Sequence, residues 1–329
     1  MKGLGGVQSA VEIAGAHAER IDRLFDIFLV VTGLMFLLVL GFLIAAMLRR
    51  SGRRQDGLPD PEGVSHDAGL RVTLAGWIGV IAIGLVGLTL ASFLSDRSLA
   101  QVSPEAQGDS RDPLAITVTA QQWWWQVDYD DPIPSQRVAT ANELVLPVGR
   151  PVDIRLESTD VIHSFWVPSL AGKQDLIPGR HNDIRLLPTK VGRFRGQCAE
   201  FCGMQHAHMA FDVTVVSPAE FERWRTRQLA TPAPPTTPLA QAGYDYFMNN
   251  QCSACHQIAG TPANGRVGPN LTHVASRRSL AAGAMPNNLG HLYGWVADPQ
   301  SQKPGVNMPY IGLEPAQLHA VVAYLETLK

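Results

Sequence analysis

The sequence of 329 residues predicts a multidomain membrane protein with three parts: a transmembrane helical hairpin, an all-β sandwich and a small C-terminal domain. Three observations predict this class. Two uncharged apolar runs lie near the N-terminus, short alternating segments follow them, and a proline-rich stretch precedes the C-terminal part. Composition agrees, because 46% of the residues are hydrophobic and only 17% are charged. The net charge of -2 gives no indication of nucleic-acid binding, and we expect no nucleic-acid partner.

The two apolar runs are long enough to cross a membrane. No charged residue occurs from Ile27 to Leu48 or from Val72 to Ser95, and each run would extend roughly 30 Å as a helix. We therefore expect spans at about 26–48 and 72–95, within a hairpin that covers residues 24–95. Two buried helices of a large soluble core are the alternative, but uncharged runs of this length favour spans.

The charges beside the spans predict their orientation. The loop 49–71 carries an excess of arginine, which marks the cytoplasmic side of a membrane. These residues are Arg49, Arg50, Arg53, Arg54 and Arg71. Both termini would then lie on the periplasmic, outer side of a bacterial plasma membrane. Residues 1–23 are too polar for a signal peptide, and we expect an external segment there with a short helix ahead of the first span.

Alternating apolar and polar residues predict a β-sandwich or Greek-key barrel from Asp112 to Ser217. The segments most typical of strands are 115–123, 143–148, 152–157 and 211–216. A short helix is expected at Pro218–Gln228, which gives a domain of residues 112–228. Residues 229–238 then form a linker, because the prolines of this segment interrupt helices and central strands. Residues 239–329 make up the last domain.

All four cysteines belong to two motifs. Cys252-Ser-Ala-Cys255-His256 is the Cys-x-x-Cys-His pattern of covalent c-type haem attachment, in which the histidine supplies an axial nitrogen. The second motif places two thiolates, an imidazole and a thioether within twelve residues, a soft ligand set that suits copper. Its members are Cys198, Cys202, His206 and Met209. A chain with both sites is expected to pass electrons.

The spacing of Cys198 and Cys202 would let both thiolates bridge two metal ions. A second imidazole is absent from the loop itself, and His163 is the best candidate because it lies at a predicted strand end before the turn at Pro168. A structural zinc site is the main alternative. Zinc sites more often use Cys-x-x-Cys pairs and recruit no thioether, so copper is favoured.

The haem iron needs a second axial ligand. Met308 lies about fifty residues after His256 and is followed by proline, which makes it the leading candidate. Met285, also followed by proline, is the alternative, and Met248 and the remaining histidines are further candidates. Methionine ligation raises the reduction potential relative to ligation by two histidines, as suits a carrier that delivers electrons to copper.

Together these motifs resemble subunit II of haem-copper cytochrome c oxidase over about residues 20–225. The residues that carry the resemblance are the two N-terminal spans, the tryptophans after Gln122, Asp160-Val-Ile-His163-Ser, Lys173–Arg180 and the cysteine loop 198–209. The C-terminal part resembles a class I cytochrome c, with Gly268-Pro269 in the loop that orients the haem histidine and Gly243, Phe247 and Tyr324 at a helix contact. The combination is similar to oxidases in which the cytochrome is fused to the copper subunit. It implies a cupredoxin-like domain followed by an all-α cytochrome domain.

The resemblance implies a binuclear copper centre, called CuA, with five side-chain ligands: His163, Cys198, Cys202, His206 and Met209. The backbone carbonyl of Glu200 would complete it, and the Glu200 carboxylate would reach a magnesium ion at the contact with subunit I. Trp123 resembles the family's electron-input tryptophan, although three adjacent tryptophans could equally serve as packing or interfacial anchors. His208 matches no ligand of the family, and we expect a solvent-facing or hydrogen-bonded loop residue.

The implied function is the electron-input subunit of a proton-translocating terminal oxidase, active as a cytochrome c oxidase only with subunit I. Electrons would pass from cytochrome c or a bc1-type complex through haem c and CuA to the oxygen-reducing haem and copper of subunit I. Subunit III and membrane lipid are further expected partners. A CuA- and haem c-bearing subunit of a nitric oxide reductase and a membrane-tethered electron carrier are the alternatives.

One departure from the resemblance concerns proton uptake. Relatives commonly carry a glutamate at the start of the second span, at the mouth of a proton route into subunit I. Leu74 stands at that position here, and Ile81 replaces a proline of the pattern. Proton uptake through this subunit would then depend on another acid, for which Glu62 and Asp67 are the candidates.

Overall fold

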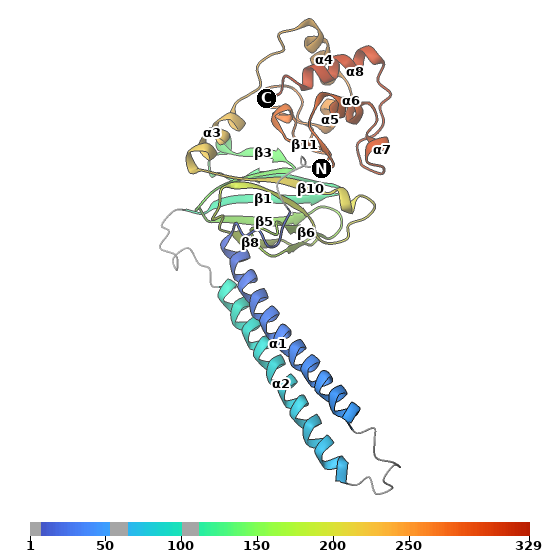
Figure 1. Ribbon diagram of the computed structural model, residues 1–329. Helices are drawn as coiled ribbons and strands as arrows, with labels where there is room; N and C mark the ends of the chain where they lie inside the picture. The colour runs from blue at the N-terminus through green and yellow to red at the C-terminus, as the bar shows by residue number, and fades with distance from the viewer. Residues whose placement is uncertain (1–7, 53–64, 101–111) are drawn as a thin grey trace. The chain divides into compact units, whose positions relative to one another are not determined.

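The computed structural model describes residues 8–52, 65–100 and 112–329 (Figure 1). These residues form two compact units. One unit holds the two long helices from Glu19 onwards, and the other holds the residues up to Ala18 together with the region from 112 to the C-terminus. Several residues that the orientation and proton-uptake hypotheses use lie outside the described side chains, namely Arg49, Arg50, Arg53, Arg54, Glu62 and Asp67.

Two long helices, α1 (Ala16–Gly52) and α2 (Ser65–Ala100), account for the two apolar runs. Their segments Ala16–Leu48 and Arg71–Arg97 are long and apolar enough to cross a membrane. Most of their large apolar side chains are exposed, as a lipid-facing surface requires. Phe42 and Trp77 join the two helices edge to face, with ring centroids 5.6 Å apart. The chain therefore has the predicted pair of apolar helices.

The first helix begins earlier than the predicted span. We expected a short separate helix before the span, whereas α1 runs unbroken from Ala16. No proline or glycine interrupts the polar first turns, and Glu19 and Arg23 form an ion pair one turn apart. The residues just before this helix also pack on the β-rich region, since Ala14 N donates to Ser169 O at 2.8 Å and Thr189 N donates to Ala14 O at 2.8 Å.

The region after residue 112 contains a sandwich of two five-stranded sheets around one hydrophobic core (Figure 1). The first sheet has the order β3-β2-β1-β5-β8, and the second has the order β4-β10-β9-β6-β7. The pairs β1–β5 and β4–β10 are parallel, and the other pairs are antiparallel. The strands are β1 (Leu114–Gln121), β2 (Trp124–Tyr129), β3 (Val138–Ala141), β4 (Glu143–Pro147), β5 (Val152–Ser158), β6 (His163–Trp166), β7 (Gln174–Leu176), β8 (Asn182–Leu186), β9 (Gly192–Cys198) and β10 (Ala210–Val216).

Strand alternation produces the core, as the sequence pattern predicts. In β1 every second side chain from Leu114 to Ala120 is buried. One expectation was wrong in detail: the predicted strand 115–123 ends at Gln121, and the chain reverses before β2 begins at Trp124. The carboxylate of Asp160 accepts a hydrogen bond from Gln122 N at 2.6 Å, so a side chain replaces the strand pairing there. This reversal places Trp123 in a turn.

The C-terminal part is helical, as the resemblance implies. A capping box at Ser217 begins α3 (Pro218–Leu229), and an extended proline-rich segment leads to α4. The remaining helices are α4 (Pro238–Asn249), α5 (Gln251–Cys255), α6 (Leu289–Ala297), α7 (Pro299–Gln302) and α8 (Pro315–Leu325), beside the short strands β11 (Ser279–Leu280) and β12 (Met285–Pro286). Helices α4 and α8 pack closely at Gly243, where an added Cβ would lie 1.9 Å from the Ala320 carbonyl oxygen.

Candidate functional site

Strand pairing brings the residues of the copper motif together. His163 begins β6 and Cys198 ends β9, and these two strands are paired with Phe165 opposite Cys198. The loop that follows returns to β10, where the Cys198 N–H donates to Met209 O at 2.9 Å. A single 3-10 turn, η3 (His206–His208), lies within this loop. Sheet edges therefore fix both ends of the loop, which we call the copper loop (residues 198–209).

The side-chain donor atoms of this motif lie as far from one another as two ligands of the same metal ion do. The two cysteine sulfurs are 3.7 Å apart. Cys198 Sγ lies 3.8 Å from His163 Nδ1, and Cys202 Sγ lies 3.6 Å from His206 Nδ1 and 3.8 Å from Met209 Sδ. Two ligands at about 2.0–2.3 Å from one ion in tetrahedral geometry are themselves about 3.3–3.8 Å apart. The residues present therefore fit a thiolate-bridged copper site.

Burial and hydrogen bonding prepare these groups to bind metal. His163, Cys198 and Met209 are fully buried, and Cys202 is nearly so. The hydrogen bond that Cys198 shares with Cys202 lowers the pKa of Cys198 and raises the pKa of Cys202, so Cys198 is the first of the two to become the thiolate that binds metal. Asp160 Oδ1 lies 2.8 Å from His163 Nε2, which leaves Nδ1 directed at the sulfurs. Sequence reasoning gave Asp160 no role, because its contact becomes visible only when the turn before β6 is in place.

Glu200 offers two oxygens in different surroundings. Its backbone carbonyl oxygen lies 3.2 Å from Cys198 Sγ, inside the donor set. Its carboxylate is about half exposed and lies 3.9 Å from Lys173 Nζ, which in turn lies 3.4 Å from Asp175. The carboxylate is thus accessible from solvent beside Lys173, whereas the carbonyl belongs to the buried site. His208 is exposed, and its Nδ1 lies 2.9 Å from Gln205 Oε1.

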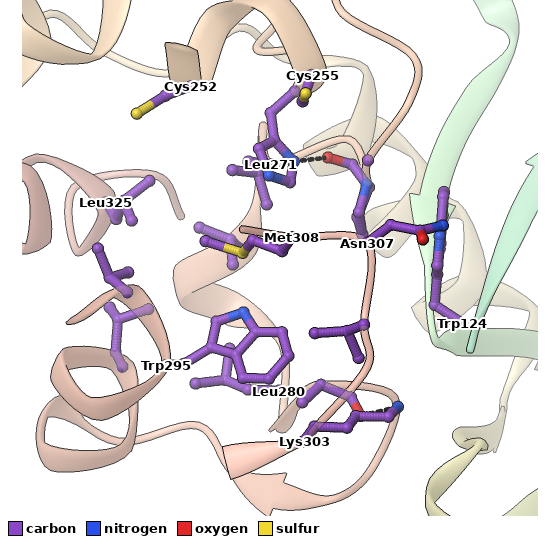
Figure 2. A pocket seen from close by; sticks show the side chains of 18 of the residues that line it. Trp124, Cys252, Cys255, Leu271, Leu280, Trp295, Lys303, Asn307, Met308 and Leu325 are labelled. Carbon is purple, nitrogen blue, oxygen red and sulfur yellow. Dashed lines mark hydrogen bonds between the residues drawn. The ribbon is translucent and has the colours of Figure 1, made fainter. Parts of the chain in front are cut away.

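The haem motif lines the main cavity of the described residues. This cavity has a volume of about 210 Å³ and is mostly apolar. Figure 2 shows Cys252, Cys255 and Met308 around it, together with Trp295 from α6 and Trp124 from β2. Burial raises the pKa of Cys252, so this thiol is held neutral before any covalent attachment. Both cysteines and both proposed axial residues therefore line one mostly apolar cavity, as a haem requires.

His256 is oriented by the chain around it. Its Nδ1 lies 2.8 Å from the carbonyl oxygen of Pro269, which leaves Nε2 available on the cavity side. Burial lowers the pKa of His256 and so favours the neutral imidazole that binds iron. A Cβ at Gly268 would lie 2.6 Å from the His256 ring, so glycine allows this loop to approach the imidazole. The Gly268-Pro269 segment thus has the geometry that the sequence implied.

The structure separates the two Met-Pro candidates. Met308 lines the cavity, whereas Met285 is buried in the hydrophobic core of the helices and does not line it. Gln300 of α7 holds residues 303–308, which we call the Met308 loop. Its Nε2 donates to Val306 O at 2.8 Å and to Met308 O at 2.7 Å. Arg277 also lines the cavity, and its buried Nε lacks a hydrogen-bond partner among the described residues. The Glu143 carboxylate lies 3.9 Å from that nitrogen and forms an ion pair with it.

Trp123 lies between the two sites. Its indole Nε1 donates to Cys202 O at 2.9 Å, and Gln122 Nε2 donates to the same oxygen at 2.8 Å. The same tryptophan lines the haem cavity and is only 8% exposed. Trp125 has a different position, because it is fully buried in the sandwich core against Phe211. Of the two buried tryptophans in the run, Trp123 is the one that contacts the copper loop.

Comparisons with known proteins agree with this arrangement. The family described as "Cytochrome C oxidase subunit II, periplasmic domain" matches residues 132–216, and the cytochrome c family matches residues 240–329. Cytochrome c oxidase subunit 2 of Alkalihalophilus pseudofirmus is 33% identical over 324 residues, which cover 98% of this chain and 91% of the relative. The Bacillus subtilis subunit 2 is 29% identical, with 94% and 90% covered. The periplasmic domain of subunit II from Bradyrhizobium japonicum has 32% identity and a TM-score of 0.34, over 36% of this chain and 94% of that one.

These findings carry several conclusions. The relatives are oxidase subunits, so the nitric oxide reductase alternative is not favoured and the chain is an electron-input oxidase subunit with a subunit I partner. Its two families imply copper and haem as cofactors, and its apolar helices anchor a periplasmic domain to a membrane. The chain belongs to the cytochrome c oxidase subunit II family, in the form that carries a C-terminal cytochrome c domain.

Proposed function

We propose that this subunit receives electrons at a covalent haem c and passes them through a binuclear CuA centre to subunit I. When bound, the haem iron and the copper pair each accept and release one electron. The observation that carries the proposal is the position of Trp123, whose indole contacts the copper loop and lines the haem cavity. We therefore assign Trp123 as the electron-input residue of the copper site.

The proposed copper ligands are His163, Cys198, Cys202, His206 and Met209, with the backbone carbonyl of Glu200. The burial of His163, Cys198, Cys202 and Met209 and the separations of 3.6 to 3.8 Å between donor atoms support this set, as does the absence of a Cys-x-x-Cys zinc pattern in the loop. Asp160 holds His163 in the orientation that directs Nδ1 at the thiolates. The half-exposed Glu200 carboxylate is proposed to reach a magnesium ion shared with subunit I.

The proposed haem ligands are Cys252 and Cys255 as thioether partners, with His256 and Met308 as axial groups. The chain contributes orientation and apolar surroundings. Pro269 directs the imidazole, Gln300 holds the Met308 loop, and an apolar cavity surrounds the ligands. A thioether ligand in a mostly apolar cavity raises the reduction potential relative to a second imidazole, so the haem can accept electrons from the proposed donor.

The wider assignments are also proposals. We place both termini and both cofactor domains on the periplasmic side of a bacterial plasma membrane, with domains at 24–95, 112–228 and 239–329 and a linker at 229–238. Cytochrome c or a bc1-type complex is the proposed donor, and subunit III is a proposed partner beside subunit I.

Metal analysis and spectroscopy of the purified oxidase complex test the cofactor assignment. The wild type should show a c-type haem spectrum and the signal of a delocalised mixed-valence copper pair. Cys202→Ser should abolish the copper pair and leave the c-type haem spectrum and the copper of subunit I unchanged. Zinc in place of the copper pair, or a wild-type spectrum in the variant, would contradict the assignment.

A further inference from the structure

A buried lysine lies where the C-terminal residues 239–329, which we call the cytochrome part, meet the copper loop. Lys303 follows α7 and is only 1% exposed, although lysine is rarely buried so completely. Its Nζ donates hydrogen bonds to Trp123 O at 2.8 Å, His208 O at 2.7 Å and Ala281 O at 2.9 Å. Two of these acceptors belong to the sandwich, and the third belongs to the cytochrome part. Figure 2 shows Lys303 on the wall of the haem cavity.

The three carbonyls match the chemistry of an ammonium group. An ammonium has three N–H donors and no acceptor, so every donor of Lys303 is satisfied. None of the ion pairs found among the described residues includes Lys303, and the three carbonyl dipoles are its direct polar partners. Burial lowers the pKa of Lys303, whereas the three carbonyl acceptors favour the charged ammonium over the neutral amine. A leucine or methionine could fill the same volume without desolvating a charge, so the hydrogen bonds are the distinctive feature of this residue.

Neighbouring contacts hold the same loop against the copper site. Gln205 Nε2 donates to Pro304 O at 2.7 Å. A Cβ at Gly305, where φ is +86°, would lie 3.3 Å from Met204 Cε and 3.7 Å from the Trp123 ring, so the loop backbone packs directly on these side chains. On its other side the loop is held by Gln300. Residues 303–308, which end at the proposed axial methionine, are thus fixed from two directions.

Other polar contacts join the sandwich and the cytochrome part at different places. Ser279 Oγ donates to Asp212 at 2.5 Å, and Arg277 Nε lies 3.9 Å from Glu143. These contacts reach β4 and β10, and they can stabilise docking without touching the electron route. Lys303 differs because two of its three partners are the backbone carbonyls of Trp123 and of His208 in the copper loop. Its loss should therefore alter the relation of the two cofactor sites more than the stability of the fold.

We propose that Lys303 is a positioning residue for electron transfer within this chain. Its ammonium group fixes the Met308 loop against Trp123 and the copper loop, so that electrons pass from haem to copper in one docked arrangement. The proposal rests on the proposed function, because it requires haem on residues 252–256 and copper on the copper loop. Without the hydrogen bonds of Lys303, the cytochrome part would sample other arrangements. Only the fraction of molecules in the docked arrangement would then transfer electrons.

Lys303→Met in the full-length subunit of the purified oxidase tests the proposal, because methionine keeps an unbranched apolar stem and removes all three donors. Lys329→Met, at an exposed lysine of the same cytochrome part, is the matched control. In Lys303→Met we expect unchanged haem and copper spectra, faster hydrogen exchange in residues 122–126 and 206–210, and haem-to-copper transfer slowed about tenfold or more. Lys303→Gln, which keeps two donors, should be intermediate. Wild-type exchange and transfer in Lys303→Met would overturn the proposal.

A second measurement uses the wild type, so it tests the fixed arrangement even if Lys303→Met fails to assemble. Haem-to-copper transfer from one fixed arrangement should proceed at the same rate in buffer and in viscous glycerol solution. If the cytochrome part had to move before each transfer, the rate would fall as the viscosity rises. A viscosity-dependent wild-type rate would overturn the role of Lys303. The spectra recorded on the same samples keep the two proposals apart, because absence of the haem or the copper signal in the wild type would instead contradict the proposed function.

Discussion

The indole of Trp123 donates a hydrogen bond to the backbone carbonyl of Cys202, across 2.9 Å and 79 residues of sequence. This bond attaches the turn between β1 and β2 to the copper loop. Since Trp123 also lines the haem cavity, one side chain connects the two cofactor sites. The proposed electron path therefore includes a contact within the protein as well as the proposed ligands.

Trp123→Phe should slow haem-to-copper transfer while both cofactor spectra persist. Phenylalanine removes the N–H donor, but Gln122 continues to donate to the Cys202 carbonyl, so the loss of stability should be only about 1 kcal/mol. Time-resolved reduction of the purified complex measures the effect. Trp124→Phe is the control, because Trp124 lines the cavity from β2 and should leave the transfer rate unchanged. Equal slowing in both variants would argue against the assignment.

Met308→His should lower the reduction potential of the haem, since an imidazole replaces a thioether that favours ferrous iron. The thioether-to-iron absorption band should disappear, and the copper signal should remain. Redox titration followed by optical spectroscopy measures both. Met285→His is the matched substitution in the helical core, and it should leave the absorption band in place. If the band survives in Met308→His and vanishes in Met285→His, the axial ligand is Met285.

Asp160→Asn should weaken copper binding. The Asp160 carboxylate lies 2.8 Å from His163 Nε2, and loss of such an acceptor typically reduces metal affinity by roughly 10–100-fold. Competition with a copper chelator measures the change in the assembled oxidase. Asp153→Asn is a suitable control, because Asp153 pairs with Arg185 away from the donor set. Copper affinity that is unchanged in Asp160→Asn would show that the carboxylate does not support His163.

Gly243→Ala should destabilise the cytochrome part and reduce haem incorporation. The added methyl group would lie 1.9 Å from the Ala320 carbonyl oxygen at the contact of α4 with α8. Such overpacking costs about 1–3 kcal/mol. Gly290→Ala serves as the control, since its nearest neighbour would lie at an ordinary 3.6 Å from the new Cβ. Haem content per subunit and thermal unfolding measure the difference, and equal haem content in both variants would contradict the close packing.

Much of the fold was predictable because its signals are local. Uncharged runs indicated α1 and α2, alternation indicated the sandwich, and the spacing of Cys198, Cys202, Cys252 and Cys255 marked both cofactor motifs. Positions that depend on distant partners were not predictable in this way. The strand expected through Trp123 ends at Gln121, because the turn is stabilised by Asp160 from 38 residues further along the chain.

Lys303 illustrates the same limit. No local pattern distinguishes it from a surface lysine, since its hydrogen-bond acceptors lie 180, 95 and 22 residues away in sequence. The preference for Met308 over Met285 likewise rested on spacing and resemblance, and the cavity supplied independent support. Sequence motifs name candidate ligands, whereas the side chains that hold the ligand loops become visible only in the folded chain.

The central claim is that electrons pass from the haem to the copper pair within this subunit. Flash reduction of the haem in the purified oxidase, with haem and copper absorption recorded together, tests it most directly. Haem reoxidation should match the rise of reduced copper in the wild type, and in Cys202→Ser the haem should stay reduced. Haem reoxidation at the wild-type rate in Cys202→Ser, or without any copper reduction in the wild type, would contradict the account.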